Sequence, residues 1–276
     1  MRPVSLMCRA AGLSRSGYYA WRRRAECRRA IEDRRLLVEI KAIHQQSRQT
    51  YGSPRIHAEL RSRGILCNLK RIVRLMRRYG IRGIIRRRFV ITTKSEHDYP
   101  IAPNTLNRQF HADAANRVWL TDITYIATDE GWLYLAAVMD LHSRRIVGWA
   151  FSSRIDRQLT QDALAMALGR RRPEPGLLHH SDRGSQYACA DYQELMIQHD
   201  LAGSMSRKGN PYDNAVMESF FRTLKTEAVY TIRLATREEG KTTLVEYIEV
   251  FYNQHRRHSA LGYLSPAEFE RQHGPA

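Results

Sequence analysis

Three acidic residues occupy positions where a carboxylate has chemical consequences. Asp122 lies within an apolar run that is predicted to be a β-strand, where an unpaired carboxylate is costly to bury. Asp182 directly follows another predicted strand, and α/β sheets commonly place ligands at the carboxyl ends of their strands. Glu218 lies on a predicted helix and points away from its apolar stripe. Together these carboxylates suit a hard cation such as Mg²⁺, which takes oxygen ligands and also binds substrate phosphate.

Each of these residues also has a simpler interpretation. An aspartate within a strand is often a hydrogen-bonded polar group, and an aspartate after a strand often caps a helix. Glu218 and Arg222 are four residues apart, as in an ordinary surface ion pair. Lys225 falls on the same side of that helix, so Glu218, Arg222 and Lys225 share one face. The combination of residues, more than any one of them, favours a metal-dependent reaction.

Hydrophobic periodicity predicts the elements that position these residues. Three runs rich in Val, Ile, Thr, Trp and Tyr predict successive strands, with Asp129-Glu130-Gly131 as a hairpin turn. Helices and short strands then alternate, and the order βββαβαβα predicts an α/β layer sandwich with a mixed five-stranded sheet. The predicted strands are 118–128, 132–140, 145–151, 176–180 and 201–205, and the predicted helices 156–169, 191–199 and 216–226. A last amphipathic helix carries an apolar stripe of Leu244, Tyr247, Ile248, Phe251 and Tyr252.

The net charge of +17 is distributed unevenly along the 276 residues. Residues 1–100 contain 25 Lys and Arg against 7 Asp and Glu, whereas residues 101–276 contain 20 against 21. A basic block beside a neutral block indicates a polyanion-binding module joined to a second domain. A generic basic surface is the alternative interpretation of the same charge.

The basic block is predicted to be helical. A helix is expected at 31–45, and Ser53-Pro54 is expected to open another as N-cap and first helical residue, ending at Leu60. Asn68 is expected to cap a further helix that Gly80 closes. The last two helices form a helix-turn-helix candidate for DNA binding; the alternative is a helical bundle with a solvated basic face. On the second helix the predicted apolar stripe is Leu69, Ile72, Val73 and Met76, and the predicted DNA-facing stripe is Arg71, Arg74 and Arg78.

The segment after this block is expected to be a basic linker that contains Arg86, Arg87 and Arg88. No apolar run approaches the roughly 18 residues of a membrane-spanning helix, and residues 1–24 are too charged for a secretory signal. The cytoplasm, in association with the nucleoid, is therefore the expected location. The four cysteines show no zinc-site spacing.

Several ordered motifs resemble those of a known family. They are YGSPRI (51–56), WLTDITY (119–125), HSDRGSQY (180–187), KGNPYDNA (208–215) with ESFF (218–221), YNQHRRHSALGY (252–263) and SPAE (265–268). The chain resembles the DDE transposases of bacterial insertion sequences, which are of the retroviral-integrase type, and among them the second-reading-frame proteins of the insertion-sequence-three group. The 35 residues between Asp182 and Glu218 match the spacing of that family, and Lys225 matches its basic residue seven positions after the glutamate.

The resemblance implies a fold and a mechanism. It implies a ribonuclease-H-like core for about residues 110–230, preceded by an all-α helix-turn-helix-type region. It implies that Asp122, Asp182 and Glu218 hold two Mg²⁺ or Mn²⁺ ions for in-line displacement at phosphorus, first by water and then by a DNA 3′-hydroxyl. Lys225 and Arg222 are expected to hold DNA phosphate near the metals. Further candidates for contacting DNA or bracing the acids are Gln186, Asn210 and Asn214, and His180 is either an orienting or a structural histidine.

The expected organisation has three parts: a DNA-binding region at 1–100, a catalytic core at 101–232 and a C-terminal helical extension at 233–276. The expected partners are element-end and target DNA, further copies of the chain on that DNA, and an upstream-frame protein of the same element, since the family's active enzyme is often a frameshift fusion. The alternatives are a DNA-binding regulator or a partial transposase that is inactive without that partner, and a structure-specific nuclease of the same fold.

Overall fold

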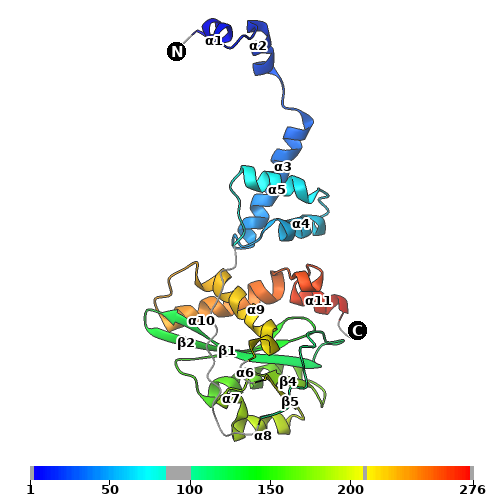
Figure 1. Cartoon of the computed structure of the whole chain (residues 1–276), viewed down its shortest axis with the longest axis vertical. Helices are drawn as coiled ribbons and strands as arrows, with labels where there is room; N and C mark the ends of the chain where they lie inside the picture. Colours follow the sequence, from blue (N-terminus) through cyan, green and yellow to red (C-terminus); the bar gives the residue numbers. More distant parts are fainter. Residues whose placement is uncertain (1–2, 85–100, 208–209, 274–276) are drawn as a thin grey trace. The chain divides into compact units, whose positions relative to one another are not determined.

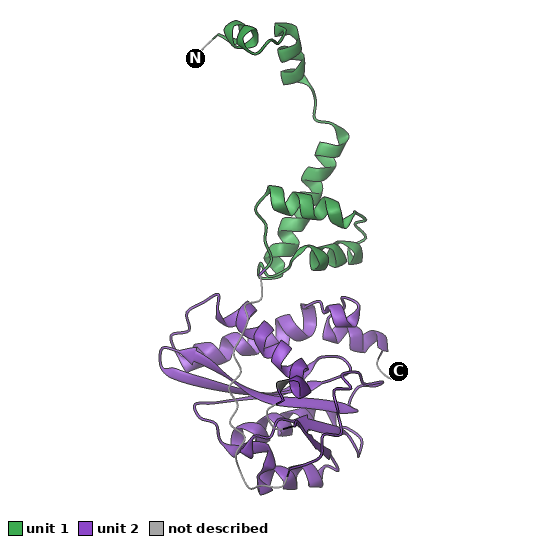
Figure 2. Ribbon diagram, in the orientation of Figure 1, with its two compact units in different colours: residues 1–83 green, residues 84–276 purple. Residues whose placement is uncertain are grey.

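The computed structural model describes residues 3–84, 101–207 and 210–273 of the chain. Residues Met1–Gly83 and Ile84–Ala276 form two compact units (Figure 2), which are described separately below. The predicted linker residues Arg86, Arg87 and Arg88 lie outside the described residues. No helix in the described stretches has both the length and the apolar character needed to cross a membrane.

The first unit is entirely helical in its described part, as predicted. Its helices are α1 (Val4–Ala10), α2 (Arg15–Arg23), α3 (Arg28–Gln46), α4 (Ser53–Ser62) and α5 (Leu69–Arg78). The Asn68 side chain caps α5 as expected, by accepting a hydrogen bond from the backbone N–H of Lys70 at 2.8 Å. The predicted cap of α4 is displaced by one residue. Gly52 is the N-cap, and Ser53 and Pro54 both lie in the first turn.

The apolar face of α5 differs from the predicted stripe. Ile72 and Met76 are buried as expected, but the third buried residue is Leu75, while Leu69 and Val73 are exposed. Because α5 packs against both α3 and α4, the side of the helix that bears Leu75 is covered as well. The periodicity of α5 alone does not show which neighbouring helices cover it, so the exact limits of its buried face could not be predicted.

The second unit is built on the predicted mixed sheet. Its strands are β1 (Val118–Thr128), β2 (Gly131–Asp140), β3 (Ile146–Ser152), β4 (Leu178–Ser181) and β5 (Ala202–Met205), in the spatial order β3-β2-β1-β4-β5 (Figure 1). The first three strands are antiparallel, whereas β4 pairs with β1, and β5 with β4, in parallel. This topology places the carboxyl end of β4 beside the first half of β1, since β4 pairs with Val118–Leu120.

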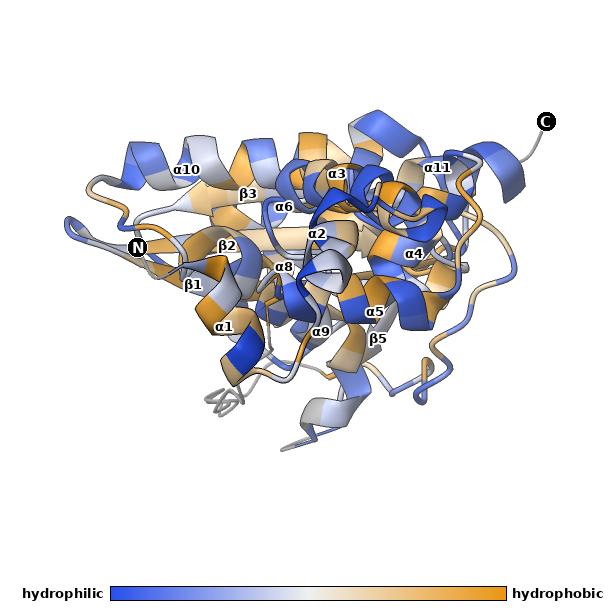
Figure 3. Ribbon diagram, turned by 90° about the horizontal axis from the view of Figure 1, so that it is seen from above, coloured by the Kyte–Doolittle hydropathy of each residue, from blue (hydrophilic) through white to orange (hydrophobic). Residues whose placement is uncertain are grey.

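Helices cover both faces of this sheet. Figure 1 shows α6 (Arg157–Arg171), α7 (Ser185–Ala188) and α8 (Ala190–Gln198) on one side of it, and α9 (Ala215–Leu224), α10 (Arg237–Val245) and α11 (Pro266–His273) on the other. The first group buries a core against the sheet that includes Trp119, Val138, Leu164, Tyr187 and Met205. In Figure 3 β2 and β3 are mainly hydrophobic in colour, in agreement with their burial.

Two of the predicted helices change their winding. The helix expected at 216–226 is α-helical only to Leu224 and continues as a π-helix over Lys225–Val229. Similarly, α10 continues as a π-helix over Glu246–His255. The five residues of the predicted C-terminal apolar stripe, Leu244, Tyr247, Ile248, Phe251 and Tyr252, are all buried, which confirms the amphipathic interpretation.

The C-terminal helices are joined to the sheet by specific polar contacts. The Asn253 amide pairs with the backbone of Ile146 in β3, accepting from its N–H and donating to its carbonyl oxygen, both at 3.0 Å. The Arg256 guanidinium makes two 2.8 Å hydrogen bonds to the buried Glu227 carboxylate, which also accepts one from the Tyr247 hydroxyl. Residues after α9 therefore anchor the end of the helix that carries Glu218.

Candidate active site

Asp122 and Asp182 lie near each other where the pairing of β1 with β4 ends. The last residue pair of the parallel β1–β4 ladder is Leu120 and His180, and Asp122 and Asp182 each follow two residues later, Asp182 directly after the end of β4. Neighbouring strands are about 4.8 Å apart, and side chains at equal offsets on parallel strands share a face. Each carboxylate is fixed by a backbone donor: the Ile123 N–H donates to Asp122 Oδ1 and the Gly184 N–H to Asp182 Oδ1, both at 2.8 Å.

The pairing of these carboxylates is electrostatically unfavourable without a cation. Burial, and then the negative charge of Asp182, raise the pKa of Asp122 well above its ordinary value. The charge of Glu218 adds a smaller contribution in the same direction. Two adjacent carboxylates that cannot both ionise freely form a site that a proton or a metal ion must neutralise.

Glu218 approaches this pair from α9, which packs on β1. It is partly buried, and that burial raises the pKa of its carboxyl group, while Arg222 opposes the shift. Within the described residues, however, no three acidic, histidine or cysteine side chains are close enough together to enclose a metal ion. The charge of Asp182 affects Asp122 more strongly than the charge of Glu218 does.

Lys225 is directed toward the carboxylates by the π-turn that follows α9. The backbone N–H of Tyr230 donates to the Lys225 carbonyl at 2.8 Å, which widens the turn at this residue. The side chain is buried, and its Nζ lies 4.4 Å from the centre of the Tyr125 ring. Burial lowers the pKa of Lys225 to about 8, against the opposing effect of the nearby Asp122.

Three more residues of the quoted motifs surround the aspartates. Asn214 is buried and donates from Nδ2 to the Thr121 carbonyl at 3.1 Å, whereas its Oδ1 has no hydrogen-bond partner among the described residues. Tyr187, which the sequence analysis did not assign, is fully buried, and burial followed by the charges of Asp182 and Asp122 raises the pKa of its hydroxyl. Gln186 lies next to the same loop, because a Cβ added at Gly184 would lie 2.8 Å from Gln186 Oε1.

The other predicted DNA-contacting residues of the core occupy different settings. Arg222 is exposed and lies beside Glu218. Asn210 accepts a 3.2 Å hydrogen bond from the backbone N–H of Tyr212 and so caps the 3₁₀ turn Pro211–Asn214. His180 is buried between β4 and β5, with Nδ1 2.9 Å from Ser204 Oγ. Burial lowers the pKa of His180 to about 4, so it is neutral at physiological pH.

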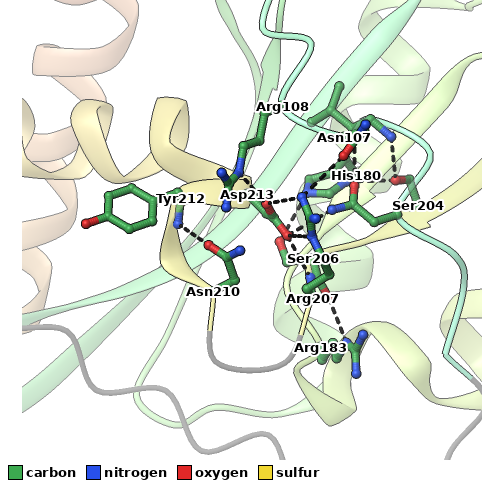
Figure 4. Close-up of polar contacts among 12 residues, drawn as sticks. Asn107, Arg108, His180, Arg183, Ser204, Ser206, Arg207, Asn210, Tyr212 and Asp213 are labelled. Atoms are coloured by element: carbon green, nitrogen blue, oxygen red, sulfur yellow. Dashed lines mark hydrogen bonds and ion pairs between the residues drawn. The ribbon is translucent and has the colours of Figure 1, made fainter.

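The carboxylate of Asp213, for which the sequence predicts no role, organises the loop in front of α9 (Figure 4). This side chain is completely buried. Its oxygens accept hydrogen bonds from the Arg108 side chain at 2.9 Å, the Arg207 side chain at 3.0 Å and the Asn104 amide at 2.8 Å. The hydrogen bonds from Arg207 hold the pKa of Asp213 far below its ordinary value. This cluster ties the chain before β1 and the chain after β5 to the start of the helix that bears Glu218.

In the first unit the structure separates the three predicted arginines of α5. Arg71 and Arg74 both bind the Asp33 carboxylate of α3, at 2.6 and 2.5 Å. Arg78 is exposed at the end of the helix. The described face of α5 that remains open contains Leu69, Lys70, Val73 and Arg77, which line a shallow cleft together with Arg74 and Arg78.

These features define a helix-turn-helix-like unit followed by an integrase-type catalytic core, and comparison with known proteins agrees. Residues 31–89 match the family model "HTH-like domain", and residues 112–211 and 218–273 match models named "Integrase core domain". A Shigella sonnei protein named "Insertion element IS600 uncharacterized 31 kDa protein" is 48% identical over 97% of this chain and 98% of its own.

"Transposase InsF for insertion sequence IS3A" of Escherichia coli is 43% identical over 98% of this chain and 94% of its own. A solved simian T-cell lymphotropic virus intasome overlaps 79% of this chain and 71% of the viral chain, with a TM-score of 0.48 and 16% identity. The chain belongs to the IS3 family of insertion-sequence transposases. It is a DDE-type transposase with a ribonuclease-H-like core.

Proposed function

We propose that Asp122, Asp182 and Glu218 bind two divalent ions, Mg²⁺ or Mn²⁺, and that Lys225 holds a DNA phosphate beside them. The observation that carries this proposal is the proximity of Asp122 and Asp182 just beyond the β1–β4 pairing, where burial and the charge of Asp182 raise the pKa of Asp122. A cation between them removes the repulsion. Glu218, on α9, supplies the third carboxylate ligand.

The carboxylates at this site are chemically suited to bind Mg²⁺ or Mn²⁺. Carboxylate oxygens are the ligands that Mg²⁺ prefers, and Mg²⁺ commonly keeps several waters and substrate oxygens in its shell. The buried Oδ1 of Asn214, with no partner among the described residues, is an acceptor suited to a water molecule of that shell. When bound, the ions supply Lewis-acid activation of the attacking oxygen and charge stabilisation at the phosphorus and leaving oxygen.

The chain's own groups then position the DNA strand. The Lys225 ammonium, held by the π-turn and Tyr125, offers a fixed positive charge to the phosphate next to the reacting bond. Arg222, exposed beside Glu218, offers a second. Three further residues border the same region in the segments that follow β4 and β5: Gln186 in α7, Asn210 in the loop after β5, and Asn214 at the end of the 3₁₀ turn. Water serves as the attacking group in cleavage, and a DNA 3′-hydroxyl in strand transfer.

We propose that the open face of α5 contacts DNA. Lys70, Arg77 and Arg78 supply phosphate contacts, and the exposed Leu69 and Val73 supply apolar contacts of the kind that thymine methyl groups accept. Arg71 and Arg74 both bind Asp33 and so orient α5 on α3, while Arg74 also borders the open face. The predicted Arg86, Arg87 and Arg88 extend the basic segment that follows.

We further propose that the chain acts as a homo-oligomer on DNA, because both ends of an element must be processed together. An upstream-frame protein of the same element is the proposed additional partner, supplied as a fusion. Since its substrate is chromosomal DNA, the protein is expected to work at the nucleoid.

The metal proposal is tested by binding without DNA. Isothermal titration with Mg²⁺ is compared between the native chain and Asp122→Asn, Asp182→Asn and Glu218→Gln. We expect saturable binding to be lost in the two aspartate variants and weakened in Glu218→Gln. The matched control is Glu174→Gln, an exposed glutamate outside the site. Unchanged Mg²⁺ binding in Asp122→Asn or Asp182→Asn would show that the ions bind elsewhere.

A further inference from the structure

A cavity of about 430 Å³ lies beside the Lys225 side chain. It is formed by the β1–β2 hairpin and by the chain at the end of the π-turn and after it. Its volume is within the roughly 300–1,000 Å³ that is typical of small-ligand sites. The walls come from β1 and the start of β2 and from the chain at 229–234. None of the three carboxylates lines it, so it is a neighbouring space and not the proposed metal site.

The walls of this cavity are unusually aromatic for an open surface. Trp132 is 50% exposed, Tyr230 61% and Tyr125 38%. Tyr125 and Trp132 meet edge to face with ring centres 5.0 Å apart, as a diagonal pair across the two strands. Such a pair stabilises a hairpin by itself. It does not account for Tyr230, which comes from a different segment and leaves most of its ring open to the same cavity.

The charges at the cavity suit a nucleic acid. The Lys225 ammonium lies 4.4 Å from the centre of the Tyr125 ring and also close to Asp122, so one side chain borders both the cavity and the carboxylates. At the opposite rim Arg233 pairs with Asp129 at 2.9 Å and remains 84% exposed. Exposed aromatic rings combined with cations are the means by which proteins bind unpaired bases, through stacking and phosphate contact.

We propose that this cavity binds one unpaired nucleotide of the DNA strand that enters the active site. Its base stacks on Tyr230 and Trp132, and its phosphate lies at Lys225. The base must be unpaired because a base inside a duplex has both faces covered by its neighbours and is not available to stack on protein rings. The inference rests on the proposed placement of Lys225 at the reacting phosphate, since only then does the cavity lie along the path of that strand.

Photocrosslinking tests the inference directly. The full chain is irradiated with a duplex that carries 5-iodouracil in a short unpaired 3′ tail, and the crosslinked peptides are mapped by mass spectrometry. We expect crosslinks at Trp132 or Tyr230, and their loss when the same base is paired inside a blunt duplex. Crosslinks that map only outside 125–132 and 225–234, or equal crosslinking of the paired base, would overturn the inference.

Paired substitutions separate stacking from other effects. Tyr230→Ala should weaken affinity for the tailed duplex by about 5- to 150-fold, as removal of one base–aromatic stack does, while affinity for the blunt duplex is unchanged. Tyr230→Phe and Trp132→Phe keep a ring and should retain most of the affinity. Equal losses on both DNAs, or a loss in Tyr230→Phe as large as in Tyr230→Ala, would contradict stacking. A thermal melt of each variant verifies the fold.

The outcome is distinguishable from failure of the proposed metal site. Crosslinking is performed without metal, and the Mg²⁺ titration is performed without DNA, so either can fail while the other succeeds. Protection of Tyr230 from chemical labelling that rises with protein concentration in the absence of DNA would assign the cavity to a second copy of the chain, and would also overturn the nucleotide inference.

Discussion

Replacement of Asp122 by Asn is expected to stabilise the metal-free protein while it abolishes metal binding. The pKa of the Asp122 carboxyl is raised by burial and by Asp182. A carboxyl group whose pKa is higher in the folded than in the unfolded state favours folding only at low pH, and that contribution is lost as the pH rises through the folded-state pKa. Near neutral pH the ionised pair therefore opposes folding. Asn keeps an oxygen that can accept the hydrogen bond from Ile123 but carries no charge.

The size of the effect follows from the geometry of β1 and β4. At a strand spacing of about 4.8 Å and an effective dielectric constant of about 20, two carboxylates repel by about 3.5 kcal/mol. Both side chains are partly exposed, and the pair can share a proton, so the expected gain is reduced to about 1–3 kcal/mol. For a domain of this size that gain raises Tm by about 2–10 °C.

The assay is thermal unfolding with EDTA and again with Mg²⁺, near neutral pH. The native chain should gain stability from Mg²⁺, because the ion binds the folded state, whereas Asp122→Asn should not. The control is Asp191→Asn, which removes the charge of an exposed aspartate that contacts Arg157 at 3.2 Å and lies in the first turn of α8. Its Tm should change little, and equally in both conditions. A lower Tm for Asp122→Asn in EDTA, or equal stabilisation of both proteins by Mg²⁺, would refute the reasoning.

Three further predictions concern the supports of the site and the DNA-binding face. Asp213→Asn should destabilise the core by about 2–4 kcal/mol in urea unfolding, because it removes the buried negative charge that Arg108 and Arg207 both bind. A change in the free energy of unfolding below about 0.5 kcal/mol would contradict a stabilising role for these contacts. Glu227→Gln should cost about 3–5 kcal/mol in the same measurement, because it leaves the Arg256 charge buried, and an unchanged midpoint would contradict this. DNA affinity should fall steeply with salt, and Arg77→Ala should reduce the salt slope by about one, whereas Arg71→Ala should lower Tm with little change in slope. The salt slopes are measured by fluorescence-anisotropy titration. A larger reduction of the slope in Arg71→Ala than in Arg77→Ala would show that Arg71 is the residue that contacts DNA.

Local patterns predicted those parts of the molecule whose signals are contained within one element. The strand at Val118–Thr128, a hairpin turn directly after it and the carboxylate after the fourth strand all appear in the structure as expected, although Gly131 belongs to β2 and not to the turn. The stripe that begins at Leu244 is buried as its spacing predicts. Each of these features depends on residues of a single element or turn, so the local sequence is sufficient to predict it.

Features that depend on partners distant in sequence were not predictable in this way. The Asp33 carboxylate that holds Arg71 and Arg74 is 38 and 41 residues away from them, so helical periodicity alone assigned both arginines to the open face. Asp213 looked like one polar residue in a turn, and its burial depends on Arg108, which is 105 residues away. The π-turn at Lys225 has no sequence signature comparable to a glycine or proline.

The two aspartates are an instructive intermediate case. Their positions within and after strands were visible in the sequence, but their proximity depends on the parallel register of Leu120 and His180. That register links segments 60 residues apart and emerges only from the folded sheet. The resemblance to a family supplied the missing step, because it associates the two aspartates and Glu218 in one site.

The measurement that tests the central claim most directly is a cleavage and strand-transfer assay with labelled element ends and Mg²⁺. It compares the native chain with Asp122→Asn, Asp182→Asn and Glu218→Gln, each supplied also as the upstream-frame fusion, so that a need for that partner is separated from loss of the site. We predict that the native protein cuts the ends and joins them to target DNA, and that all three variants do neither while they still bind DNA. Cleavage or joining that persists in any of the three variants would contradict the assignment of the active site.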